Sequence, residues 1–121
     1  MSKRNRRAGH NWERECVEIL SEFFPHIVTS RSESRSRDDQ KVDLINKDEY
    51  ENGRLPIQIQ CKTTVNSVNY SKLLDEMPEG DNVVLHKRTV KSEKGKFVTK
   101  GKYAIMEIDL FLKLLKDWKL K

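Results

Sequence analysis

The spacing of the apolar residues changes twice along the chain, and this change constrains the fold more than any other feature. Residues 9–24 carry apolar side chains at helical spacing, and Pro25 ends the run. Residues 55–63 instead alternate apolar with polar, which is typical of a strand. Helical spacing returns near the C-terminus, where Asp109 is placed to cap a last helix. The sequence therefore predicts an α/β fold, a central mixed sheet flanked by helices.

The remaining elements follow from shorter patterns. We expect strands over residues 26–30, 41–46, 82–88 and 102–108, and a short helix over 70–77. Asn52-Gly53 favours a hairpin between the second and third strands. Residues 31–40 carry no apolar side chain and predict a mobile loop. Residues 1–8 are interpreted as a flexible basic arm, and residues 9–121 as a single domain.

Composition narrows the class of protein. Of the 121 residues, 36% are charged and 36% hydrophobic, so a core can form but is small, and self-association would help. No apolar run approaches the roughly 18 residues that a membrane helix needs. Cys16 and Cys61 have no CxxC spacing, which indicates a reduced protein and a cytoplasmic location.

Positive charge is clustered. The net charge is +5, and cations crowd residues 3–7, 31–41 and 87–102. Three clusters in so small a chain favour a polyanionic partner, although charge alone leaves DNA, RNA and a membrane surface open. His10, His26 and His86 lack the spacing of zinc ligands, and His86 is interpreted as a phosphate contact or an exposed side chain.

A few polar residues lie where the pattern expects apolar ones. Glu13 falls on the apolar stripe of the first helix or at its edge, where its carboxylate reaches solvent or needs a cation waiting for it. Asp43 stands among strand formers, and Gln60 and Lys62 share one face of the next strand. An acid on a helix, an acid in a strand and a polar-x-Lys pair suit Mg²⁺-assisted hydrolysis of a phosphodiester.

These residues resemble the PD-(D/E)xK nucleases, and among them the archaeal-type and phage Holliday junction resolvases. The resemblance is carried by Gly-His-Asn-Trp-Glu-Arg at 9–14, Val-Asp-Leu-Ile at 42–45 and Ile-Gln-Cys-Lys-Thr at 59–63. The Ser/Arg-rich segment after the first strand and the helix near 69–77 extend it over about residues 9–90. It implies a restriction-endonuclease-like fold.

The resemblance also implies roles for individual residues. Glu13, Asp43, Gln60 and the backbone carbonyl of Cys61 would bind Mg²⁺, for which Mn²⁺ can substitute. Lys62 would be the catalytic lysine, and a loop serine, Ser32 or Ser34, would assist. Gln60 departs from the family pattern, which has Glu or Asp there; its amide oxygen can still ligate, with weaker electrostatics.

The activity so implied is that of a homodimeric endonuclease that cuts four-way DNA junctions to 5′-phosphate and 3′-hydroxyl ends. Its phosphate contacts would come from Arg4, Arg6, Arg7, Arg31, Arg35, Arg37, Lys87 and Arg88. Two alternatives stay open: an Mrr-like or repair endonuclease acting on duplex or nicked DNA, and an inactive nucleic-acid-binding module.

Overall fold

Five strands form one mixed sheet in the order β1-β2-β3-β4-β5. The structure, a computed structural model, describes residues 3–120, without the side chain of Arg4. The strands are β1 (Ile27–Thr29), β2 (Leu44–Asn46), β3 (Gln58–Thr64), β4 (Asn82–Lys91) and β5 (Phe97–Met106). β3 and β4 are parallel and the other neighbours antiparallel, so the predicted mixed sheet is confirmed.

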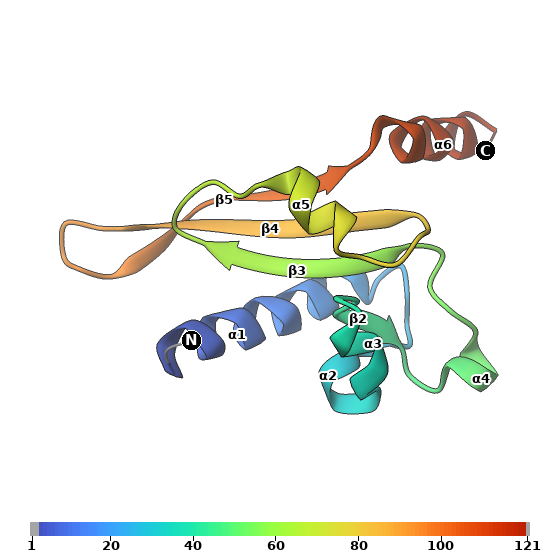
Figure 1. The fold of residues 1–121 in the computed structure, drawn as a ribbon, viewed down its shortest axis with the longest axis horizontal. Helices are drawn as coiled ribbons and strands as arrows, with labels where there is room; N and C mark the ends of the chain where they lie inside the picture. The colour runs from blue at the N-terminus through green and yellow to red at the C-terminus, as the bar shows by residue number, and fades with distance from the viewer. Residues whose placement is uncertain (1–2, 121) are drawn as a thin grey trace.

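Helices cover both faces of the sheet. They are α1 (Lys3–Leu20), α2 (Ser30–Glu33), α3 (Arg35–Asp39), α4 (Glu49–Asn52), α5 (Tyr70–Asp75) and α6 (Ile108–Lys119). Figure 1 shows α1 on one side of the central strands and α5 on the other. None of these helices, within residues 3–120, is long and apolar enough to cross a membrane.

The core lies mainly between α1 and the sheet. Trp12 is 3% exposed and packs with Cys16, Ile27, Leu44 and Ile59, as its place at the start of the apolar stripe predicts. Its indole Nε1 donates a hydrogen bond to the carbonyl oxygen of Leu85, 2.9 Å away on β4. A smaller cluster joins α5 to the opposite face of β4. α1 is therefore fixed against the centre of the sheet, which sets the position of Glu13.

The first helix begins earlier than its apolar pattern predicts. Residues 3–8, interpreted above as a flexible arm, are the first turns of α1; Met1 and Ser2 lie outside the described residues. This segment has no large apolar side chain, so periodicity could not detect it. Its lysine, arginines and alanine are nevertheless strong helix formers, and the helix extends through them.

The mobile loop expected over residues 31–40 is wrong, because α2 and α3 occupy this segment. The expected hairpin is confirmed in that β2 and β3 pair antiparallel, but the short helix α4 lies in their connection. Gly53 follows α4 with φ +74°, a left-handed conformation that glycine adopts without strain. The Asn52-Gly53 signal thus marks the end of a helix. In the chain as folded, β2 begins only at Leu44, and Asp43 precedes it.

The second half of the chain differs in smaller ways. β4 and β5 form a long hairpin around Gly95 and extend past the predicted limits, to Lys91 and back from Phe97. Glu107, and not Asp109, occupies the cap position of α6. His86 is buried on the central strand β4, where its Nε2 lies 2.8 Å from the Thr64 hydroxyl. It is therefore neither exposed nor available to a phosphate.

Stability should depend on the contact between α1 and the sheet. Leu44 is 1% exposed, whereas Leu120, beyond α6, is 85% exposed. We expect Leu44→Ala to lower the free energy of unfolding by about 2–5 kcal/mol, since it leaves a cavity in the core. The matched change Leu120→Ala should stay within about 0.5 kcal/mol of the wild type. Urea unfolding measures both, and equal losses would contradict this placement of the core.

Candidate active site

The candidate site lies at Asp43, the residue before β2, beside β3. The paired register of β2 and β3 is Leu44 opposite Ile59, and the N–H of Asp43 donates to the Ile59 carbonyl at 2.8 Å. The N–H of Cys61 donates to the Asp43 side chain, with Oδ2 2.8 Å from the nitrogen. Both the backbone and the side chain of Asp43 are thus held against β3. Cys61 contacts Asp43 through its N–H, whereas its carbonyl oxygen remains a predicted metal ligand.

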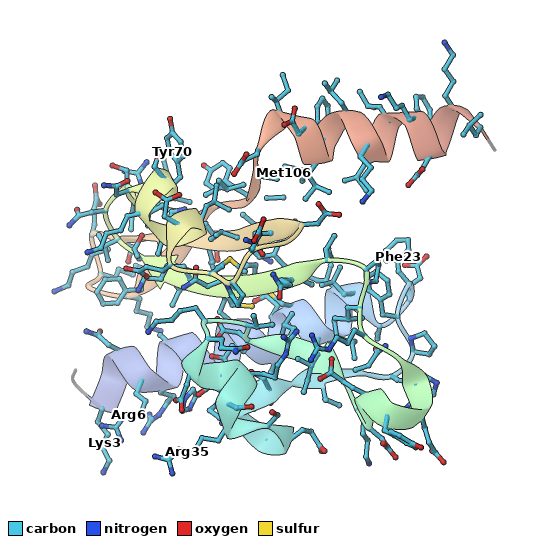
Figure 2. The ribbon with its side chains drawn as sticks, turned by 45° about the vertical axis from the view of Figure 1, so that its right-hand side comes forward. Lys3, Arg6, Phe23, Arg35, Tyr70 and Met106 are labelled. Carbon is cyan, nitrogen blue, oxygen red and sulfur yellow. The ribbon has the colours of Figure 1, made fainter. Side chains whose placement is uncertain are left out.

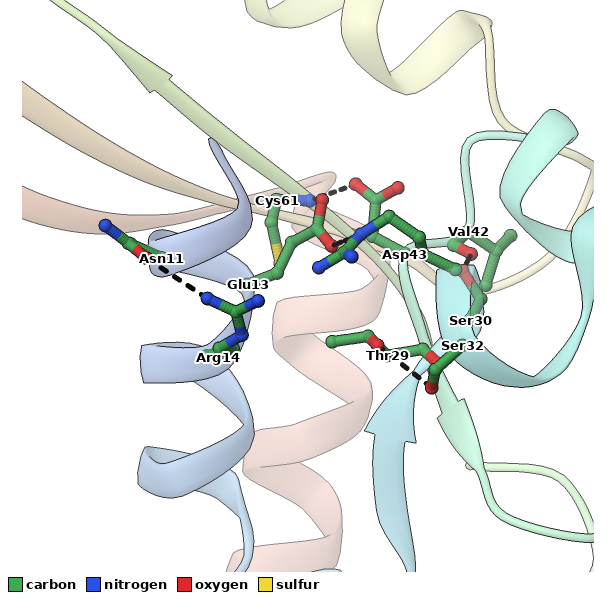
Figure 3. Close-up of polar contacts among 10 residues, drawn as sticks. Asn11, Glu13, Arg14, Thr29, Ser30, Ser32, Val42, Asp43 and Cys61 are labelled. Atoms are coloured by element: carbon green, nitrogen blue, oxygen red, sulfur yellow. Dashed lines mark hydrogen bonds and ion pairs between the residues drawn. The ribbon is translucent and has the colours of Figure 1, made fainter. Parts of the chain in front are cut away.

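Glu13, on α1, approaches the carboxylate of Asp43. Figure 3 shows its carboxylate and that of Asp43 pointing toward one another beside Cys61. The Glu13 side chain is only 13% exposed, so the interpretation of it as a solvated stripe-edge residue is wrong. The expected cation is present: Nε of Arg31 lies 3.3 Å from Oε1 of Glu13. Arg31, predicted only as a phosphate contact, also balances this buried charge.

The two carboxyl groups are electrostatically unfavourable as a pair. Burial, and then the nearby charge of Asp43, raises the pKa of Glu13 to about 7, although Arg31 opposes the shift. Burial also raises the pKa of Asp43 to about 6, against the lowering effect of the Cys61 N–H. Asp38 on α3 raises both pKa values. Negative charge is therefore concentrated here beyond what the neighbouring cations neutralise.

Lys62 and Gln60 extend the site along β3. The positive charge of Lys62 is close enough to lower the pKa of Asp43, and its side chain is exposed. Gln60 is 6% exposed, and its Oε1 is buried without a hydrogen-bond partner in the part of the chain described. A buried amide oxygen without a donor is destabilising unless some other positive group contacts it. Within the described residues, Gln60 has no hydrogen bond to Glu13 or Asp43, so its ligand role stays a prediction.

The donors suit a hard divalent cation. Mg²⁺ prefers oxygen ligands, keeps several waters and needs only one or two carboxylates. Glu13 and Asp43 supply two carboxylates whose raised pKa values a cation would reverse. Within residues 3–120, no three histidine, cysteine, aspartate or glutamate side chains are grouped closely enough to form a complete metal cage by themselves. Two carboxylates beside one another are thus a donor set that would suit Mg²⁺.

The hydrogen bonds of Ser32 and Ser34 are made away from the two carboxylates, and an assisting role for either serine stays a prediction. The Ser32 hydroxyl donates to the Thr29 carbonyl, and the Ser34 hydroxyl lies 3.4 Å from that of Ser36. Neither has a contact with the carboxylates among the hydrogen bonds found. The buried serine is Ser30, whose hydroxyl donates to the Val42 carbonyl and whose N–H donates to the Asp43 carbonyl at 2.8 Å. Ser30 therefore helps to position Asp43.

The predicted DNA-contacting cations divide into two groups. Arg6, Arg7, Arg31 and Arg35 are exposed, while nothing is described for the Arg4 side chain. Arg6 and Arg31 both lie near His10, whose pKa they help to lower after burial itself. The remaining three cations contact other residues of the chain. The side chain of Arg37 is 11% exposed and pairs with Glu49. Lys87 pairs with Glu15, and Arg88 donates a hydrogen bond to the Val65 carbonyl.

Sequence reasoning missed Ser30 and Asp38 as members of the site. Asp38 lies in the segment that was interpreted as a loop and Ser30 at the end of the strand expected over residues 26–30, so nothing in the apolar pattern singled them out. A buried serine can be recognised only once α2 is known to follow β1 directly.

Comparison with known proteins adds no relative. No protein-family model matches the chain, and neither the curated proteins nor the solved structures contain a significant match.

The raised pKa values predict a pH-dependent stability in the absence of divalent cations. Between the ordinary carboxyl pKa near 4 and the folded value, the native state binds more protons than the unfolded state. The free energy of unfolding therefore falls as the pH rises from 4.5 to 7.5. One pKa unit corresponds to about 1.4 kcal/mol, so the raised pKa of Asp43 lowers the free energy of unfolding by on the order of 3 kcal/mol once the group is ionised.

Asp43→Asn should remove that contribution, so the variant gains stability relative to the wild type as the pH rises. The exposed Asp75→Asn change on α5 is the matched control and should leave the profile unchanged. Urea unfolding in EDTA at several pH values measures all three proteins. Parallel profiles for wild type and Asp43→Asn would contradict the assignment of a strained carboxylate to this position.

Proposed function

We propose that the chain is a metal-dependent, structure-selective DNA endonuclease of the PD-(D/E)xK type, which hydrolyses phosphodiesters in four-way junctions. The products are 5′-phosphate and 3′-hydroxyl ends. The proposal is supported chiefly by the approach of the Glu13 and Asp43 carboxylates beside β3, with the charge of Lys62 close enough to act on Asp43. Glu13 comes from α1 and Lys62 from β3, whereas Asp43 directly precedes β2.

Each side chain has a distinct task in this proposal. Glu13 and Asp43 hold Mg²⁺, and Gln60 offers an oxygen that has no other partner. The cation supplies positive charge to the phosphoryl oxygens and makes water a better nucleophile. Lys62, which is exposed and whose charge acts on Asp43, would orient that water and hold the phosphate as negative charge develops. Water attacks phosphorus in line, and the 3′-oxygen leaves.

Arg31 links the chemistry to DNA binding. In the absence of a cation its guanidinium neutralises Glu13. A cation held by Glu13 would neutralise that carboxylate in place of Arg31, and the exposed guanidinium could then bind a phosphate of the substrate. The same residue thus fits both the ion pair of the free protein and the predicted DNA contact.

Two basic surfaces flank the site. The first turns of α1 carry Arg6 and Arg7, and the tip of the β4–β5 hairpin carries Lys91, Lys94, Lys96 and Lys100, all exposed. The N-terminal end of α1 and the hairpin extend in the same direction from the sheet (Figure 1), and Figure 2 shows Lys3 and Arg6 projecting from that end of α1. Such contacts bind phosphates without reading bases, which suits selection of DNA by shape.

A four-way junction offers two equivalent strands to be cut. Two symmetric sites therefore suit it, and a homodimer with a two-fold axis supplies them. The dimer is part of the proposal.

Cleavage of labelled DNA in Mg²⁺ tests the function directly. The wild type should cut a four-way junction in preference to linear duplex and single strands. We expect Asp43→Asn and Lys62→Ala each to lower the cleavage rate by at least about 100-fold, because each removes a group that stabilises the transition state. Both variants should still bind the junction in a gel-shift assay.

Asp75→Asn and Lys47→Ala are the matched controls, since both residues are exposed, and both variants should cut normally. Equal cutting of junction and duplex would favour the related endonuclease acting on duplex DNA. Salt-sensitive binding without any Mg²⁺-dependent cutting would indicate an inactive binding module. Normal cutting by Lys62→Ala would refute the proposed site.

The basic end of α1 should contribute to the salt dependence of binding. Each phosphate contact adds about 0.9 to the slope of log affinity against log salt concentration. The double variant Arg6→Ala/Arg7→Ala should therefore lose about two units of slope at most, together with affinity. Lys47→Ala/Arg54→Ala removes two exposed cations near α4 and should change little. Fluorescence anisotropy at several salt concentrations measures the slopes, and equal slopes for the two double variants would contradict this assignment.

A further inference from the structure

The hairpin of β4 and β5 extends beyond the rest of the sheet. β3 ends at Thr64, which pairs with Arg88, so from Thr89 onward β4 pairs only with β5. A register shift between Arg88 and Thr89 marks this boundary, and such a bulge increases the local twist. Figure 1 shows the hairpin projecting past the end of β3. Residues 89–100, which form this projection, are called the ribbon below.

The ribbon keeps a regular structure to its tip. Its two strands pair at three positions, which are Thr89 with Thr99, Val90 with Val98 and Lys91 with Phe97. The turn closes through hydrogen bonds from the Ser92 N–H to the Lys96 carbonyl at 2.7 Å and from the Gly95 N–H to the Ser92 carbonyl at 2.9 Å. Gly95 has φ +81°, the left-handed conformation typical of a three-residue hairpin loop. The projection is therefore a preformed two-stranded element.

Both faces of the ribbon meet solvent. Neighbouring residues of a strand point to opposite faces, so Phe97 and Val98 lie on different faces. Phe97 is 42% exposed and Val98 is 46% exposed, and every residue from 93 to 100 is exposed. A ribbon that is free on both faces can be enclosed by the two walls of a groove.

The ribbon is also strongly basic, with four lysines and a single glutamate. These residues are Lys91, Glu93, Lys94, Lys96 and Lys100. Nearer the sheet, Lys87 and Lys102 both pair with Glu15. By contrast, none of the four ribbon lysines forms an ion pair within residues 3–120. Their charge is therefore available to a polyanionic partner.

The shape of the ribbon matches one groove of DNA. The major groove of B-form DNA is about 12 Å wide and admits a two-stranded β-ribbon, whereas the minor groove is only about 6 Å wide. Lys91 lies on β4 and Lys100 on β5, so each strand of the ribbon brings a cation. A ribbon in the major groove would have phosphates on both sides, and both strands would then be next to partners for their lysines.

The ribbon reaches away from the candidate active site. Lys62 pairs with His86 across β3 and β4, and Lys91 lies five residues further along β4. At about 3.3 Å per residue, Lys91 is about 16 Å further along the strand than this pair. A contact made there lies outside the catalytic residues, so it can be changed without touching Glu13, Asp43 or Lys62.

We propose that the ribbon enters the major groove of a duplex arm of the DNA substrate. DNA is the partner because of the proposed function, on which this inference rests. The contact differs from that of a flat basic surface, which would touch phosphates and leave the groove open. It needs no metal ion, so it is measurable where cleavage is not.

Blocking the groove tests this contact without changing the charge of the DNA. Fluorescence anisotropy in EDTA compares a four-way junction with the same junction built with glucosylated 5-hydroxymethylcytosine, whose sugars occupy the major groove. The full wild-type chain should bind the glucosylated junction at least about tenfold more weakly, because the ribbon no longer fits. A shortened hairpin that lacks residues 90, 91, 97 and 98 keeps the turn and should bind the two junctions equally.

A lysine variant tests the charge of the ribbon. Lys94→Ala/Lys96→Ala/Lys100→Ala should bind the unmodified junction at least about tenfold more weakly than the wild type, because up to three phosphate contacts are lost. The matched control Lys47→Ala/Lys72→Ala/Lys116→Ala removes as many exposed lysines elsewhere. It should keep the preference of the wild type for the unmodified junction. Circular dichroism verifies that each variant is folded.

Dimethyl sulfate footprinting identifies the groove. The reagent methylates guanine N7 in the major groove and adenine N3 in the minor groove. The wild type should protect guanine N7 on an arm of the junction, and the shortened hairpin should leave those guanines reactive. Protection of adenine N3 in place of guanine N7 would overturn the inference.

Equal binding of the wild type to both junctions would also overturn it. Unchanged DNA binding by the ribbon lysine variant would do the same, and would indicate a different partner for the ribbon, such as an acidic protein. These outcomes are separable from failure of the proposed function. A chain that discriminates between the junctions but cuts no DNA refutes the nuclease alone. A chain that binds and cuts both junctions alike refutes the groove contact alone.

Discussion

The hydrogen bond from the Cys61 N–H to the Asp43 carboxylate is the contact on which the rest of the site depends. It holds the Asp43 side chain in a largely buried position beside β3. The packing of Trp12 against the sheet fixes α1, and α1 brings Glu13 close to Asp43. A second carboxylate beside a buried one is unfavourable. Burial and the repulsion between nearby carboxylates raise the pKa values of both groups.

The arrangement is costly for the protein alone and becomes favourable when a cation is bound. Arg31 neutralises Glu13 only in part, from an exposed position at 3.3 Å. Structures keep such unfavourable charge chiefly where function uses it. The fold therefore explains why two acids sit together, and the proposed chemistry explains what they would do.

Much of the fold could be predicted because local pattern and tertiary contacts agree. The helical stripe led to α1 and to a buried Trp12, and alternation led to β3 with Ile59 and Cys61 facing the core. Prediction failed where no apolar signal exists. Residues 3–8 and 30–39 are helical through propensity and local hydrogen bonds, and periodicity does not register either one.

The site was predictable only in outline for a similar reason. Residue type and spacing pointed to Glu13, Asp43 and Lys62, but pairing across 18 residues, as between Glu13 and Arg31, has no local signature. His86 was misjudged because its basic neighbours suggested a surface, whereas β4 is paired on both sides and buries it. The contribution of Ser30 depended on α2 following β1 without a loop.

Calorimetric titration with Mg²⁺ at pH 7, in two buffers of different ionisation enthalpy, tests the central claim most directly. The account predicts that the wild type binds the cation and releases protons, because Glu13, and to a smaller extent Asp43, are partly protonated at that pH. Glu13→Gln and Asp43→Asn should each lose most of the affinity, while Asp75→Asn should keep it. Unchanged Mg²⁺ binding in both site variants, or no binding by the wild type, would contradict the account.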